Sequence, residues 1–175
     1  TNLRIDNGKI QNLNVDQSPV VNNGTLTIGT NDDTVSDNSI ILYGKTTGLA
    51  QNGQFYFYDG YIEGDTALRG GYNGCPNEYY VIVIWDSVLN CQKAKLSLTP
   101  EGAKVKVRSA TNGVPTEPAT YVFYFSLDSG IKATTNTNPD VYVVVPLLEN
   151  SDNIDVEEGQ ILKIHLDGNT VENIS

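Results

Sequence analysis

Apolar residues alternate with polar ones along most of this chain, and Gly, Asn, Asp and Pro interrupt the alternation at short intervals. A period of two is typical of a β-strand, because successive side chains of a strand point to opposite faces of its sheet. A helix would instead repeat its apolar residues every three or four positions, and no stretch long enough for an ordinary helix shows that spacing. The sequence therefore predicts an all-β fold made of short strands.

The first part of the chain contains an internal echo. Segment 23–29 (NGTLTIG) returns 29 residues later as 52–60 (NGQFYFYDG), and 7–13 (NGKIQNL) is a fainter copy. Self-similarity at such a period is typical of stacked coils, so we predict a short right-handed parallel β-helix over residues 1–97. Asn-Gly is also the strongest two-residue hairpin signal, and a series of antiparallel hairpins is the alternative.

The strands predicted after residue 97 are longer and alternate more regularly, at 103–108, 120–127, 140–145 and 160–166. Prolines lie at the ends of these segments, where a missing backbone N–H does the least harm to a sheet. Several such strands in a short region predict a small Ig-like β-sandwich over residues 98–175. The sequence leaves open whether the two regions are separate domains or share one sheet.

The chain has 21 acidic and 11 basic residues, which give it a net charge of −10. A negative field of this kind repels nucleic-acid phosphates and anionic lipid, so neither is expected as a partner. No apolar run approaches the roughly 18 residues of a membrane helix, and we expect no membrane insertion.

Two cysteines, Cys75 and Cys91, flank the strand-like segment 79–85. A disulfide between them would stabilise a small β-rich protein, and we predict one. Two buried free thiols are the alternative. The chain also has no methionine, which an oxidising environment would tolerate well. Both features favour an extracellular location.

A ligand site is predicted at three tyrosines. In segment 55–58 the alternation places Phe55 and Phe57 on one face and Tyr56 and Tyr58 on the other, so a phenylalanine core would display the tyrosines. Together with Tyr61 they could stack on the apolar faces of sugars. The alternative is that these tyrosines only pair with neighbouring strands, because tyrosine has a high strand propensity.

A calcium site is predicted in the acidic segment 149–159. Its carboxylates lie one to three residues apart, and clustered oxygen ligands on a turn suit Ca²⁺. The candidate ligands are Asp152, Asp155, Glu157 and Glu158. A soluble acidic loop is the alternative, and no cofactor other than calcium is expected.

We predict that the protein is not an enzyme and name no catalytic residue. The only histidine, His165, alternates with Ile164 and Leu166 and falls on the solvent side of its strand, where a lone histidine is ordinary. A nucleophilic triad needs a base that is held beside the nucleophile, and no such arrangement is visible in the sequence.

Segment 22–96 resembles repeat segments of poorly characterised cell-surface proteins of Gram-positive bacteria, in the stretches NGTLTIG, ILYG and NGQFYFYDGYIEG. The resemblance covers less than half of the chain and implies β-helix-like stalks at the cell surface, with no catalytic residues. We therefore expect a structural module, either a stalk segment or a self-assembling filament subunit, whose partners are copies of itself or neighbouring surface-protein domains. The alternative is an adhesin or carbohydrate-binding module for host or cell-wall glycans.

Overall fold

The computed structural model describes residues 1–31, 35, 40–112, 114–136, 138–147, 154 and 161–170. Its elements are almost all strands, and the single helix among the described residues, α1 (Leu127–Lys132), has six residues. The predicted all-β class is therefore confirmed. None of the described residues forms a helix with the length and apolar character that crossing a bilayer requires.

The first nine strands form three parallel ladders. One ladder contains β1 (Asn2–Ile5), β4 (Thr25–Ile28) and β7 (Gln54–Phe57). The second contains β2 (Gly8–Asn12), β5 (Ile40–Gly44) and β8 (Tyr61–Gly64), and the third contains β3 (Val20–Asn22), β6 (Thr47–Gln51) and β9 (Thr66–Arg69). The chain thus passes three times through the same three ladders, and we call residues 2–69 the three-pass region.

The internal echo corresponds to neighbouring strands of one ladder. Thr25 pairs with Gln54 and Ile28 with Phe57, so the two clear copies lie side by side in parallel, 29 residues apart in the chain. The fainter copy at residues 7–13 is not their third member: β1 is the neighbour of β4, while Gly8 begins β2 and pairs with β5. That part of the prediction is wrong, because an Asn-Gly pair marks a corner without saying which ladder follows it.

The interior of the three-pass region is packed with side chains that lie above one another in successive passes. Leu26 packs beside Phe55, Leu42 beside Ile62, and Leu49 beside Leu68, and all six are at most 1% exposed. Burying a large apolar side chain stabilises a protein by about 1.5–3 kcal/mol, so these columns are a main source of stability.

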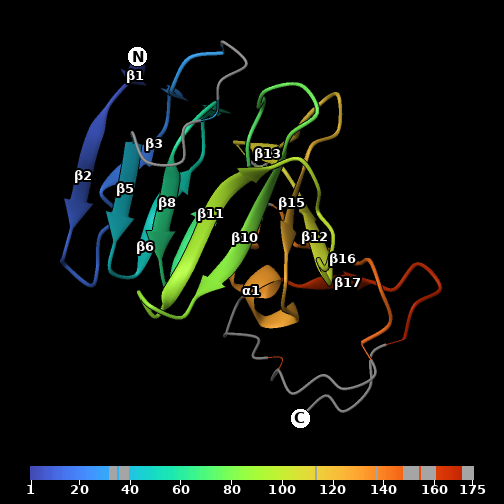
Figure 1. The fold of residues 1–175 in the computed structure, drawn as a ribbon. Helices are drawn as coiled ribbons and strands as arrows, with labels where there is room; N and C mark the ends of the chain where they lie inside the picture. The colour runs from blue at the N-terminus through green and yellow to red at the C-terminus, as the bar shows by residue number, and fades with distance from the viewer. Residues whose placement is uncertain are drawn as a thin grey trace.

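One sheet joins the two halves of the chain. It has nine strands in the order β17-β16-β12-β15-β10-β11-β8-β5-β2 (Figure 1). Its other members are β10 (Tyr80–Asp86), β11 (Cys91–Ser97), β12 (Val105–Arg108), β15 (Tyr121–Tyr124), β16 (Asp140–Val143) and β17 (Lys163–His165). The junction is β11, which runs antiparallel to both β8 and β10.

The sheet order does not show the Ig-like β-sandwich that the sequence predicted over residues 98–175. Among the described residues, the strands of that region extend the nine-stranded sheet, apart from the short pair β13 (Ala110–Thr111) and β14 (Val114–Pro115). One face of the nine-stranded sheet, which we call its inner face, is covered by α1. This helix packs on β12 and β15 of that sheet and on β9. Clean alternation predicted one buried face per strand correctly, but it could not tell whether a second sheet or a helix covers that face.

The helix begins where a long strand was predicted. Segment 120–127 alternates throughout, but the strand ends at Tyr124 and α1 starts at Leu127. Ser126 is the N-cap, and its side-chain oxygen accepts a hydrogen bond from the backbone N–H of Ser129. A serine cap satisfies one of the otherwise unpaired N–H groups of a first helical turn, which stabilises this short helix.

Candidate functional site

The three predicted ligand tyrosines do not lie together. Tyr56 and Tyr58 are half-buried beside Gly74, with their rings stacked 6.3 Å apart. Burial, together with Tyr56 and Cys75, raises the pKa of Tyr58. Tyr61 lies on the other side of a corner, on β8 in the nine-stranded sheet. The face that carries Phe55 and Phe57 is the core face, since both are fully buried.

The predicted disulfide is not formed. Cys75 and Cys91 are both free thiols, and Cys75 Sγ donates a hydrogen bond to the Tyr79 carbonyl oxygen at 3.1 Å. Cys91 lies at the other end of β10, opposite Asp86. The seven residues of β10 span roughly 20 Å, whereas a disulfide needs Cα atoms within about 7 Å of each other. Cysteines that flank a whole strand are therefore held apart by it.

The predicted calcium ligands Asp152, Asp155, Glu157 and Glu158 lie outside the described residues. Among the residues that are described, no three His, Cys, Asp or Glu side chains come close enough to hold a metal ion.

The first pass of the three-pass region leaves one end of the stack open. Strands β1, β2 and β3 are the outermost strands of their sheets, so each has a backbone edge with no neighbouring strand in the described chain. Side chains at interior positions are exposed there: Leu3 is 47% exposed although its neighbour Leu26 is 1% exposed. Ile10 is 37% exposed although its neighbour Leu42 is fully buried.

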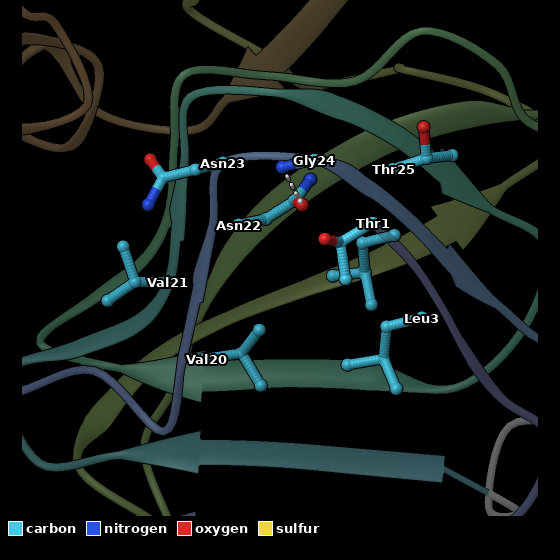
Figure 2. Close-up of a pocket in the computed structure, with 9 residues that line it drawn as sticks. Thr1, Leu3, Val20, Val21, Asn22, Asn23, Gly24 and Thr25 are labelled. Atoms are coloured by element: carbon cyan, nitrogen blue, oxygen red, sulfur yellow. Dashed lines mark hydrogen bonds between the residues drawn. The ribbon is translucent and has the colours of Figure 1, made fainter.

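A hollow of about 320 Å³ lies at this open end. Figure 2 shows Leu3 and Val20 facing it from β1 and β3, with the corner at Asn22, Asn23 and Gly24 above them. The backbone N–H of Gly24 donates to the Asn22 side-chain oxygen at 3.1 Å and fixes this corner.

A buried polar ladder continues from that corner into the stack. Asn22 donates from Nδ2 to Gln51 Oε1 at 2.6 Å and to the Gln54 carbonyl oxygen at 2.7 Å. Gln51 in turn donates to the Gly53 carbonyl oxygen. Both side chains are buried, and because buried polar groups need partners, the ladder fixes how one pass sits on the next.

The opposite end of the stack is covered. Strand β8 pairs with β11, and residues 73–74 extend the ladder of β7 through hydrogen bonds to Phe55 and Phe57. Beyond β9, Ala110 donates its N–H to the Gly70 carbonyl oxygen, and the Tyr124 hydroxyl donates to the Leu68 carbonyl oxygen at 3.4 Å. The two ends of the three-pass region therefore differ: one is open and one is closed.

The outer face of the nine-stranded sheet, which we define as the face opposite α1, carries polar and aromatic side chains. At its centre, Lys93 Nζ lies 3.2 Å from Glu63, 3.4 Å from Asp86 and 4.1 Å from the Tyr61 ring centroid. Burial disfavours the charge of Lys93, but its interactions with Glu63 and Asp86 outweigh that effect and raise its pKa. Tyr61 thus belongs to an ion-pair cluster.

The predicted solvent-side position of His165 is confirmed, and the structure adds a partner. His165 Nε2 lies 2.6 Å from Asp140 Oδ1, and its imidazole ring stacks on Tyr142 with centroids 4.5 Å apart. The sequence could not reveal this pair, because it depends on β16 and β17 lying side by side in parallel although 19 residues separate them along the chain.

No protein-family model, curated protein or solved structure matches this chain.

Proposed function

We propose that this protein is a non-catalytic extracellular structural module of a bacterial cell-surface protein, and that it caps one end of a longer β-helical stalk. In this proposal the three-pass region is a short right-handed β-helix, and its far end is closed by residues 73–74, β11, Ala110 and Tyr124. The open end receives a further coil from a neighbouring surface-protein domain of the same repeat type.

The observation that carries the proposal is the change in burial between the first pass and the second. Leu3 and Ile10 occupy the same columns as Leu26 and Leu42, but only the second pair is buried. A solvent-exposed first layer that continues a buried column is what stacked repeats leave when a neighbour is missing, since each repeat contacts only the next.

The backbone supports the same partner. Three edges, those of β1, β2 and β3, are open at once and face the same direction along the stack. A single extended peptide would pair with one edge only, whereas a coil with three strands pairs with all three. The closed far end makes the module terminal, because head-to-tail growth of a filament would need an open surface at both ends.

Adding one coil tests the proposal. The chain would be extended before Thr1 by a copy of residues 53–69, the pass without a long insertion, joined through an Asn-Gly corner. Covering Leu3 and Ile10 should contribute about 2 kcal/mol, so we expect the melting temperature to rise by roughly 4–8 °C.

A matched extension keeps the same length but carries Phe55→Ser, Phe57→Ser and Ile62→Ser within the added copy. It should give no rise, because its strands can pair but cannot extend the apolar columns. An unchanged melting temperature for the first extension, or an equal rise for both, would overturn the proposal.

A further inference from the structure

Aromatic side chains gather on the outer face of the sheet, in its C-terminal half. The register places them on neighbouring strands: Tyr121 and Phe123 on β15, Tyr142 on β16 and His165 on β17. Tyr80 on β10 joins them, with its ring 5.6 Å from that of Phe123. We call these five residues the aromatic patch.

The rings of the aromatic patch are ordered by mutual contacts. Tyr121 and Tyr142 meet edge to face with centroids 5.9 Å apart, and His165 stacks on Tyr142. Tyr80 is 39% exposed, and the other four residues are half-buried, so part of each side chain remains in contact with solvent. The patch crosses five adjacent strands, β10, β15, β12, β16 and β17, a span of roughly 19 Å. That length suits an oligomer better than a single small molecule.

Lys106 lies at the centre of the aromatic patch. It is paired across the sheet with Phe123 on one side and Tyr142 on the other, and its Nζ is 4.6 Å from the Tyr121 ring centroid. Within the described part of the chain, Lys106 has no carboxylate partner. A cation held over aromatic rings keeps its charge available for an anion.

The other charges near the aromatic patch are partly balanced. Arg108 pairs with Glu117, but its buried Nε has no hydrogen-bond partner among the described residues. His165 pairs with Asp140, which lies across from the exposed Lys163. Asp167 adds a further negative charge that acts on Tyr142. The cations here without an ion pair among the described residues are therefore Lys106 and Lys163, in a chain whose net charge is −10.

We propose that the aromatic patch binds an extended polysaccharide that carries spaced carboxylates. Sugar rings would lie against the exposed parts of Tyr121 and Tyr142, and Lys106 would bind a carboxylate. Aromatic side chains provide large, rigid contact surfaces with a polar end, as recognition of a sugar requires.

Single-stranded nucleic acid also combines ring stacking with charge, but it fits less well. It carries a phosphate on every nucleotide and needs a continuous basic track. Here Arg108 already holds Glu117, which leaves Lys106 and Lys163 as separate cations rather than a continuous track. Two cations with room for an anion match a polymer whose charges are widely spaced.

The probe is hyaluronan, which has a carboxylate on every second sugar, and binding would be measured by calorimetry at low salt. Tyr142→Ala and Lys106→Gln should each weaken binding roughly tenfold. Lys106→Gln should also flatten the salt dependence, and Tyr142→Phe, which keeps the ring, should restore nearly full affinity. The control is Tyr61→Ala, because Tyr61 also lies beneath a lysine on the outer face but is separated from β16 by four strands.

Four results would overturn the proposal. They are no binding of hyaluronan by the unaltered protein, equal binding of uncharged dextran, tighter binding of an oligo-dT strand, and equal weakening by Tyr61→Ala. Each variant is first melted to show that it is folded. None of these results bears on the open end of the three-pass region, so this proposal and that of a stalk cap stand or fall separately.

Discussion

At the scale of single residues, Asp86 stabilises the β10–β11 hairpin. Its Oδ1 accepts hydrogen bonds from the backbone N–H groups of Leu89 and Val88, both at 3.0 Å, and Oδ2 faces Lys93. The bond from Leu89 is the largest cause of a lowered pKa, since each of these partners favours the carboxylate.

The lowered pKa makes a stability contribution that depends on pH. A carboxyl with a lower pKa in the folded state stabilises the protein above its unfolded pKa of about 3.9, and this is lost as pH falls through the folded value. Asp86→Asn should therefore lower the melting temperature at pH 7, and the difference from the unaltered protein should shrink below about pH 4. Melts between pH 7 and pH 2 test this, with Asp16→Asn as the control. A difference that is constant with pH would show that the carboxylate charge has no role.

The residue scale also shows what alternation alone can and cannot predict. It correctly placed Phe55 and Phe57 on one face and Tyr56 and Tyr58 on the other, because the face of a strand residue depends only on whether its position is odd or even. It did not find the aromatic patch, because Tyr121, Tyr142 and His165 meet only through the pairing of distant strands. The alternation in the sequence indicates which face of its strand each of these side chains occupies. It does not indicate that the three strands lie close to one another in the sheet.

At the scale of elements, the Asn-Gly corners hold the passes close together. A Cβ atom on Gly53 would overlap the carbonyl oxygen of Gly24 in the preceding pass, and one on Gly24 would overlap the carbonyl oxygen of Thr1. Neither glycine has a positive φ, so these corners require glycine for close approach rather than for an unusual backbone conformation. Asn-Gly pairs are common in turns because both residues accept a positive φ readily, but these two glycines are needed for a different reason.

Gly53→Ala should therefore destabilise the protein, by about 2 kcal/mol or more, because the backbones of two passes would have to move apart. Chemical denaturation gives the free energy of unfolding directly. Gly74→Ala is the matched control, since the nearest atoms to its added Cβ belong to the Tyr56 side chain, which can adjust. If Gly53→Ala cost no more than Gly74→Ala, the passes would not be held at the close approach seen here.

At the scale of the whole molecule, the boundary predicted near residue 97 does not divide the nine-stranded sheet. Strand β10 pairs with β11 before that point and with β15 after it, and its inner residues Val81 and Val83 pair with Val122 and Tyr124. The prediction that strands lengthen after residue 97 is wrong: β12, β15 and β16 have four residues each, and the longest strands, β10 and β11, have seven residues and precede that point. The length and regularity of alternating segments do not show which strands share a sheet, because pairing across a boundary is decided by tertiary contacts.

A fragment of residues 1–97 should consequently fail to fold cooperatively. It would expose Val81 and Val83 and lose the contacts that close the far end of the three-pass region, including Ala110 on Gly70. The full chain should melt in one transition followed by circular dichroism, and the fragment should show none. A fragment that melted cooperatively near the temperature of the full chain would mean that the first 97 residues are an independent domain.

The difference between the two ends of the three-pass region also has a consequence for length. Neighbouring strands of a ladder are about 4.8 Å apart, so each coil added at the open end would raise the structure by that step and leave the closed end unchanged. Whole coils could then be added to or removed from such a protein without altering the residues at its closed end. The molecule would then act as a spacer of adjustable height, with the aromatic patch always carried at the same end.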